Sequence, residues 1–188
     1  NSPYITASKI ADGNKTLAAV STATKLAGGA NPTVASGDYT TALSKIETID
    51  WNVLVTDTED TANHAAIKAY IDRVRNEGKR VIGVVGEKTS VEFATRLSNA
   101  ASFNDPAIVY VANGFKGSDN VIREGYKSAA RIAGMIAAAD ITDSLTHSIV
   151  ANATEVVGGL TNAQVEQAIQ SGALVFTMNA NKQVQIEY

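Results

Sequence analysis

The chain has 188 residues, no cysteine and a net charge of −3 at pH 7, and 45% of its residues are hydrophobic. This length suits one domain with a sizeable core, and the lack of cysteine excludes a disulfide framework, a thiolate nucleophile and a cysteine-based metal site. The acidic balance offers no basic footprint for nucleic acid, and no apolar run approaches the roughly 18–20 residues that a membrane helix needs.

The chain alternates along its length between apolar runs with strand character and segments that carry a helical apolar stripe. In chain order, the expected strands cover residues 17–25, 51–56, 80–85, 107–112, 155–157, 174–177 and 183–188. The expected helices lie between them, at residues 38–47, 58–76, 89–101, 121–139 and 161–169. The last two strands flank residues 179–181 and are expected to form a terminal β-hairpin.

Capping signals mark several of the helix ends. Asp38 is expected to be the N-cap of the first helix, and Gly78 the C-cap of the second. Thr89 and Thr161 each stand three residues before a Glu or Gln, which is the spacing of a capping box. The helix at 121–139 consists mainly of Ala, Gly and Ile near its end, so we expect it to be buried on most of its surface.

Continuous apolar strands separated by helices of about a dozen residues imply an α/β fold. We expect a mostly parallel sheet sandwiched by helices, with right-handed crossovers and a final β-hairpin. Residues 1–188 are expected to form a single domain. Because the chain lacks an initial Met and stops abruptly in a strand-like run at Tyr188, we also expect it to be a fragment of a longer polypeptide.

Ligands of such sheets usually lie beyond the carboxyl ends of the strands. Asp57, Glu59 and Asp60 follow the strand at 51–56 and could hold Mg²⁺ or act as acid and base. They could equally solvate a loop and favour the positive end of the next helix. We favour this second interpretation.

The segment 83–90 superficially resembles a phosphate-binding loop. Only two residues separate Gly83 from Gly86, whereas a phosphate loop needs four, and Glu87 places a negative charge where phosphate would lie. Helix capping is expected to explain Thr89 and Ser90. The glycine-rich run 113–119 is interpreted as a mobile connection, and the pair at 158–159 as a tight turn before a capped helix.

Nucleophilic catalysis finds little support in the sequence. His64 lies seven residues after Asp57, so a hydrolase that uses both with an unassigned serine is conceivable. The Gly-x-Ser-x-Gly pattern is absent, however, and both His64 and His147 are interpreted as surface or hydrogen-bonded structural residues. We therefore predict no catalytic residue, no cofactor and no metal site.

Several segments in order resemble the core of contractile phage tail sheath proteins. The residues that carry the resemblance are 26–31, 39–43, 52–55, 125–138, 140–148, 153–157, 161–169, 172–176 and 184–188. The similarity covers nearly the whole chain. It implies a subtilisin-like α/β core without a catalytic triad, and a structural subunit rather than an enzyme.

The resemblance also implies an assembly. Sheath subunits of this family form hexameric rings around an inner tail tube, contact a baseplate, and contract to drive the tube through the host envelope without a nucleotide. They assemble in the bacterial cytoplasm and belong to the virion tail, with no nucleic-acid partner and no membrane insertion. Extended arms add strands to neighbouring subunits, and the hairpin at 183–188 is the candidate here.

Individual interface residues are harder to predict. Lys68, Arg73, Lys79 and Arg123 could pair with neighbouring subunits or be ordinary solvated charges. Two other functions stay open: a small-ligand or nucleotide-binding enzyme using Asp57, Glu59 and Lys88, and a degenerate subtilisin-like hydrolase using Asp57 and His64. The polar segment at 140–148 has no assigned role.

Overall fold

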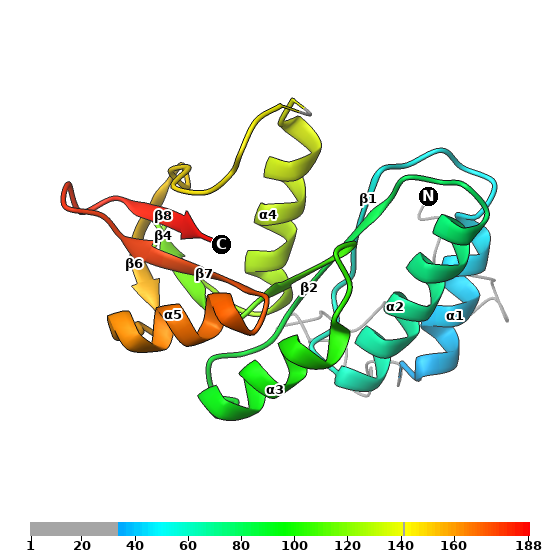
Figure 1. Cartoon of the computed structure of the whole chain (residues 1–188), viewed down its shortest axis with the longest axis horizontal. Coiled ribbons are helices and arrows are strands. Elements are labelled where there is room, and N and C mark those ends of the chain that lie inside the picture. The colour runs from blue at the N-terminus through cyan, green and yellow to red at the C-terminus, as the bar shows by residue number, and fades with distance from the viewer. Residues whose placement is uncertain (1–33, 141) are drawn as a thin grey trace, which may run out of the picture. The chain divides into compact units, whose positions relative to one another are not determined.

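The computed structural model describes residues 34–140 and 142–188, and residues 34–188 form one compact unit (Figure 1). The helices are α1 (Ser36–Lys45), α2 (Thr61–Asn76), α3 (Phe93–Phe103), α4 (Tyr126–Ala138) and α5 (Asn162–Gln170). The strands are β1 (Val53–Val55), β2 (Ile82–Gly86), β3 (Ile108–Val111), β4 (Gly114–Gly117), β5 (Ile122–Arg123), β6 (Ala153–Val157), β7 (Ala173–Met178) and β8 (Val184–Glu187).

The main sheet has five strands in the order β1-β2-β3-β7-β8. The first four are parallel, with Leu54 beside Gly83 and Val111 beside Leu174, while β8 pairs antiparallel with β7. The continuous apolar character of β2, β3 and β7 follows from burial on both faces. The expected mostly parallel sheet and the terminal hairpin are therefore confirmed.

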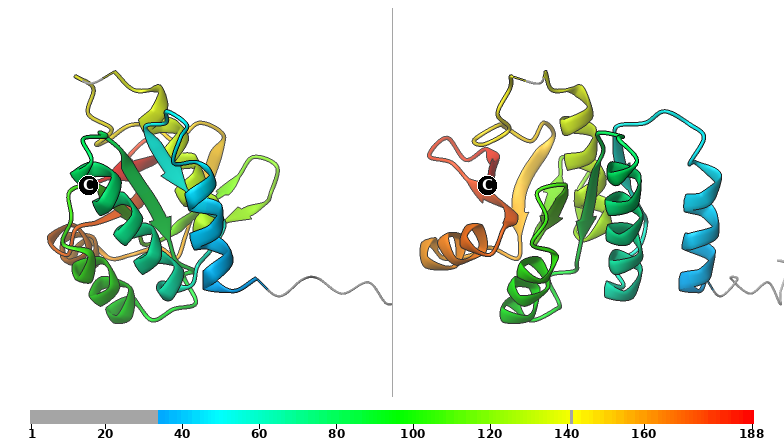
Figure 2. Two further views of the ribbon diagram at one scale, coloured as in Figure 1. Left: turned by 90° about the vertical axis from the view of Figure 1, so that its right-hand side faces the viewer. Right: turned by 45° about the vertical axis from the view of Figure 1, so that its right-hand side comes forward.

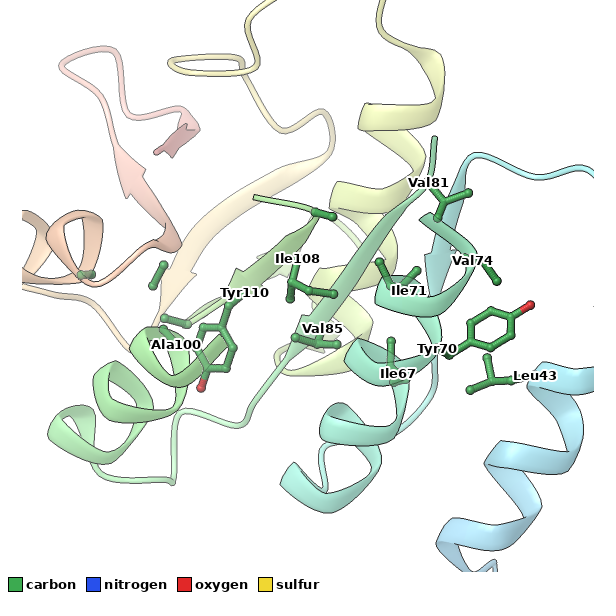
Figure 3. Close-up of a cluster of buried hydrophobic side chains, with 14 of the residues drawn as sticks. Leu43, Ile67, Tyr70, Ile71, Val74, Val81, Val85, Ala100, Ile108 and Tyr110 are labelled. Carbon is green, nitrogen blue, oxygen red and sulfur yellow. The ribbon is translucent and has the colours of Figure 1, made fainter. Parts of the chain in front are cut away.

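Two apolar clusters cover the two faces of the main sheet, and β7 contributes alternate residues to each. Ala173 and Val175 join the cluster under α1, α2, α3 and α5, whereas Leu174 and Phe176 face α4 and the second sheet. Figure 3 shows the first cluster around α2 and the neighbouring strands. The period of two along the strand thus divides its side chains between two helical layers.

A second, antiparallel sheet has the order β5-β4-β6 and lies against the α4 face of the main sheet. Its central strand β4 corresponds to the run 113–119, so the interpretation of this run as a mobile connection was wrong. Glycine suits β4 because its neighbours approach closely: a Cβ on Gly114 would lie 2.3 Å from the carbonyl oxygen of Arg123. Phe115 packs edge-on against Phe176, with 5.3 Å between ring centroids.

Helix α4 is shorter and less buried than expected. It begins at Tyr126 because Gly125, at φ +58° and ψ −133°, turns the chain out of β5. One face is buried through Ser128, Ala129, Ile132 and Ala133, and the opposite face exposes four small residues, Ala130, Gly134, Ala137 and Ala138. Apolar composition did not imply burial on all sides here, because Ala and Gly lose little when they face water.

The helix ends follow the predicted signals in part. Thr161 is the N-cap of α5 and forms a full capping box with Gln164, as expected. Gly78 adopts φ +99° just after the C-cap residue of α2, and its amide donates to the carbonyl of Arg75 over 2.9 Å. The C-cap residue is Glu77, so the prediction of Gly78 as the C-cap was wrong by one residue, although Gly78 has the positive φ that is common just after a helix end.

Two other capping predictions were wrong. Helix α1 begins at Ser36, so Asp38 lies in its first turn, where its carboxylate accepts the amide hydrogen of Ala35 over 2.8 Å. Helix α3 begins after Glu92 without a side-chain cap, and Thr89 does not cap it. The Asp38 carboxylate thus binds an amide from inside the first turn, and the Thr89 hydroxyl binds the Glu124 carboxylate instead of a helix amide.

The expected strand at 17–25 and the first matching segment of the resemblance, 26–31, lie outside the described residues. The expectation of one domain over residues 1–188 therefore stays a prediction. Within the described residues, no helix is long and apolar enough to cross a membrane.

Candidate functional site

The carboxyl ends of β1 and β2 are where a sheet of this kind usually binds its ligand. There, the Lys88 ammonium lies 2.6 Å from the Glu59 carboxylate, whose side chain is only 14% exposed. The structure thus brings together two of the three residues considered for a ligand site. This ion pair raises the pKa of Lys88, chiefly through the hydrogen bond to Glu59.

The backbone at Gly125 packs against the same region. Gly125 lies directly against Glu59: a Cβ there would be 1.5 Å from a carboxylate oxygen. Gly125 also packs on β2, because a Cβ on Gly86 would lie 2.5 Å from its carbonyl oxygen. Gly86 is therefore small to admit neighbouring backbone, and the phosphate-loop resemblance has a packing explanation.

Thr89 is held by an acid that the sequence did not point to. Its backbone amide donates to Oε2 of Glu124 over 3.0 Å, and its hydroxyl donates to the same oxygen. These bonds lower the pKa of Glu124, with the hydroxyl contributing most. The idea that helix capping explains Thr89 was wrong, because Glu124, 35 residues further along the chain, takes both donors.

Glu87 is a buried acid in the interior, not a surface charge beside a ligand. It is 2% exposed, and it accepts hydrogen bonds from the Tyr110 hydroxyl and the Asn99 amide, each over 2.8 Å. Burial is the main cause that raises the pKa of Tyr110 well above its usual range, and the bond to Glu87 adds to it. Both carboxylate oxygens are thus satisfied within the chain.

Arg96 is the other buried charge near this acid. It is 4% exposed, and its guanidinium donates to the carbonyl oxygens of Val91, over 2.9 Å, and of Ala112. Burial lowers the pKa of Arg96, while Tyr110 and Glu87 oppose that effect. The group ties the start of α3 to the end of β3, which is a structural use of a buried cation.

The Asp and His of the hydrolase alternative do not meet in a catalytic arrangement. Nε2 of His64 lies 3.0 Å from the carbonyl oxygen of Thr58, and the residue is 1% exposed inside α2. Asp57 instead accepts the Tyr39 hydroxyl over 3.1 Å. Each residue has its own structural partner, as expected for His64.

Residues 34–140 and 142–188 contain no group of three or more His, Asp or Glu side chains that could hold a metal ion. His147 lies on the surface, with Nδ1 3.3 Å from the Glu187 carboxylate. It stands at φ +64° and its amide donates to the carbonyl of Ile186, so its role is in the backbone arrangement.

The four surface cations considered for intersubunit contacts all have partners within the chain. Lys68 lies 2.8 Å from the carboxylate of Asp72, and Arg73 lies 3.0 Å from that of Glu77. The Lys79 ammonium donates to the carbonyl of Glu47 over 2.7 Å. Arg123 pairs with Asp119, so each of the four already has a contact within the chain.

The polar segment after α4 covers the outer edge of β8. The His147 amide donates to the carbonyl of Ile186 over 2.8 Å, and the Val150 amide donates to that of Val184 over 2.9 Å. Residues 147–150 therefore run along this edge of β8, with an isolated antiparallel bridge from Ile149 to Gln185. The outer edge of the terminal hairpin, which was expected to be an arm, is thus hydrogen-bonded within its own subunit.

The opposite end of the main sheet is different. Strand β1 is the last strand on that side, and among the described strands only β2 pairs with it. An unpaired strand edge is a template for another extended chain. The sequence did not point to this edge. It also did not point to Glu124, Tyr110 and Asn113, because their hydrogen-bond partners are 23 to 63 residues away along the chain.

Comparison with known proteins agrees with this picture of a scaffold. Residues 33–188 match the family model of the phage tail sheath protein central domain. Among curated proteins, the chain is similar to YqbK of Bacillus subtilis (strain 168), with 28% identity over 166 residues that cover 87% of this chain and 33% of that protein.

Two solved structures are similar to the chain over most of its length. The sheath tail protein of Desulfitobacterium hafniense superposes with a TM-score of 0.73 and 27% identity, over 83% of this chain and 35% of that one. The sheath tail protein of Listeria innocua gives a TM-score of 0.68 and 27% identity, over 87% and 35%.

The chain therefore spans about a third of the length of the relatives that it matches. The family match covers most of the chain. It agrees with the structure, in which the polar side chains after β1 and β2 bind other residues of the same chain. The chain belongs to the phage tail sheath family, whose central domain it carries.

Proposed function

We propose that this chain is the core of a sheath subunit that polymerises as rings around an inner tail tube and contracts to drive the tube through the host envelope. The family match over residues 33–188 is the observation that carries this proposal. Other sheath subunits are its main partners in a phage tail, and the tube protein and baseplate are the further partners that we infer. The subunit belongs to the virion tail and assembles in the host cytoplasm.

Several contacts favour a rigid body that moves as a unit. The Glu59–Lys88 pair, the Thr89–Glu124 bonds and the buried Glu87 each join elements that are far apart in sequence. A body of this kind can rotate between two arrangements while its interior stays unchanged, since packed interiors deform little. Energy for contraction would then come from new contacts between subunits, so no nucleotide or cofactor is required.

We further infer that strands linking neighbouring subunits come from outside residues 34–188. The last strand of the terminal hairpin, β8, is hydrogen-bonded to residues 147–150 on one side and to β7 on the other, so neither of its edges is free. The open edge of β1 is the better acceptor within the described residues. A subtilisin-like relation of the core, implied by the resemblance, stays a prediction.

Negative-stain electron microscopy of the full-length protein, expressed with and without its tube protein, tests this proposal. We expect sleeves or rings whose inner diameter matches the outer diameter of the tube. A protein that stays monomeric at high concentration, with and without the tube protein, would count against a sheath role.

The two enzymatic alternatives have separate tests. Nucleotide titration monitored by calorimetry would support a ligand site at Glu59 and Lys88, and a peptidase activity abolished by His64→Ala would support a hydrolase. The sheath proposal predicts neither signal, because Lys88 is paired with Glu59 and His64 is buried against the Thr58 carbonyl.

A further inference from the structure

A polar hollow of about 400 Å³ lies between the β4–β5 hairpin, the first half of α4 and the turn before β6. The hairpin projects from the body as a light-green loop in the left view of Figure 2. The charged residues that line the hollow are Asp119, Arg123, Lys127 and Arg131. Three of these four side chains are cations, so the hollow has a net positive charge.

The single acid in the hollow is already neutralised. Asp119 and Arg123 form a two-pronged pair, with Nη1 2.9 Å from Oδ1 and Nη2 2.5 Å from Oδ2. This pair holds the pKa of the Asp119 carboxyl far below its usual range. The charge of Arg123 is thereby balanced, and Lys127 and Arg131 supply the excess positive charge.

Neither remaining cation has a carboxylate partner among the described residues. The Lys127 ammonium makes no hydrogen bond or ion pair there, and it lies 5.8 Å from the ring centroid of Tyr126. Arg131 donates from Nη2 to the carbonyl of Ala151 over 2.8 Å, while its Nε is buried without an acceptor.

The two cations lie one helical turn apart and face the same hollow. A planar carboxylate can accept hydrogen bonds from a guanidinium and an ammonium at once. We propose that this hollow binds an Asp or Glu side chain of a neighbouring sheath subunit. This inference rests on the proposed sheath function and names a contact within that assembly.

The surroundings favour a protein partner over a small free anion. Val121 and Ile122, on the same hairpin, are 46% and 53% exposed. An inorganic anion would leave both uncovered, whereas an acidic segment of another subunit would cover them as it places its carboxylate in the hollow. Apolar side chains that become covered beside a polar rim are typical of a protein interface.

Zero-length carbodiimide crosslinking tests the contact directly, because it joins an amine only to a carboxylate that touches it. Sleeves are assembled from a mixture of ¹⁴N- and ¹⁵N-labelled full-length protein, and crosslinked peptides are identified by mass spectrometry. We expect an isopeptide bond from Lys127 to an Asp or Glu in peptides of mixed isotopic label. Lys127→Arg, which keeps the charge but lacks the amine, should form sleeves without this crosslink.

Charge reversal gives an independent measurement in the same sleeves. Lys127→Glu should reduce the assembled fraction at least tenfold, whereas Lys182→Glu, at the exposed β7–β8 turn, should leave it within twofold. Because Arg131 also binds the Ala151 carbonyl, Arg131→Glu is interpreted only if its thermal midpoint matches that of the wild type. The Lys127 variant removes no hydrogen bond or ion pair of the described fold, only the contact of its ammonium with the Tyr126 ring, and so stands alone as a test.

The outcomes separate this inference from the proposed function. Wild-type protein that forms no sleeves would overturn both. Wild-type sleeves in which Lys127→Glu assembles normally, or in which Lys127 couples only within its own chain, would overturn the carboxylate contact alone. A crosslink from Lys127 to the tube protein would likewise overturn the assignment of the partner.

Discussion

Asn113 pairs with the backbone of Phe176 as a strand would. Its Nδ2 donates to the carbonyl of Phe176 over 3.0 Å, and its Oδ1 accepts the amide hydrogen of the same residue over 2.7 Å. Asn113 is fully buried at the junction between β3 and β4. One side chain therefore joins the main sheet to the second sheet at the point where the chain leaves one for the other.

Replacing this side chain should be costly. Asn113→Ala leaves a buried amide and a buried carbonyl without partners, and we expect a loss of about 2–4 kcal/mol in the free energy of unfolding. Chemical denaturation monitored by circular dichroism measures it. Asn162→Ala, at an exposed position in the first turn of α5, is the matched control and should change the value by no more than about 0.5 kcal/mol. Equal losses in the two variants would contradict the structural role of Asn113.

Tyr110→Phe should destabilise the protein at neutral pH by about 1–3 kcal/mol, because one oxygen of the buried Glu87 loses its donor. The effect should depend on alkaline pH. Burial raises the pKa of Tyr110, so the folded chain keeps a proton that the unfolded chain releases above about pH 10. The wild type should therefore lose its advantage over the variant as pH rises past that value.

Denaturation curves of both proteins between pH 7 and pH 11 measure this difference. A constant gap across that range would contradict a raised pKa at Tyr110. Ser102→Ala, on the exposed end of α3, provides a control whose difference from the wild type should not change with pH.

Two glycines next to or within α4 should respond to alanine in opposite directions. Gly125→Ala places a Cβ against Glu59 at a residue with positive φ, and we expect a loss of at least about 2 kcal/mol in the free energy of unfolding. Gly134→Ala has open space around it on the exposed face of the helix, and should add about 0.5–1 kcal/mol. Thermal and chemical unfolding measure both changes. A shift of the free energy of unfolding in the same direction for both variants would contradict the different surroundings of the two glycines.

The bond between Thr89 and Glu124 predicts an acid-dependent effect. Because the pKa of Glu124 is lowered in the folded protein, the bond stabilises the fold above the ordinary carboxyl pKa and is lost as pH falls through the folded value. Glu124→Gln should therefore be less stable than the wild type at pH 7 and approach it below about pH 4.5. Glu92→Gln, which alters a carboxylate without a hydrogen bond among the described residues, is the control.

That comparison is a set of denaturation curves from pH 3 to pH 7. A gap between wild type and Glu124→Gln that stays constant down to pH 3 would show that the carboxylate of Glu124 is not stabilised by Thr89.

The main sheet could be predicted from sequence because its strands carry their own signal. The runs that form β2, β3 and β7 consist mainly of buried apolar residues. The start of α5 is marked by Thr161, whose side chain bonds to a residue three positions away. These are local patterns. Period and spacing within a dozen residues were enough to place them.

The features that sequence missed depend on residues far apart. Strand β4 is rich in glycine, which carries no strand preference, and it exists because Arg123 and Glu124 lie directly against Gly114. The burial of Glu87 follows from Tyr110, which another strand supplies. No local pattern encodes either relationship. The pairing of Glu59 with Lys88, which follow two neighbouring strands, is a contact of the same non-local kind.

Cryo-electron microscopy of the full-length protein assembled with its tube protein, before and after contraction is triggered, tests whether residues 34–188 move as a rigid body in a sheath. We expect a helical sleeve in both states, in which residues 34–188 superpose as one unchanged body while their orientation about the tube axis differs. A protein that forms no tubular assembly, or a sleeve in which this core changes its internal fold between the two states, would contradict this expectation.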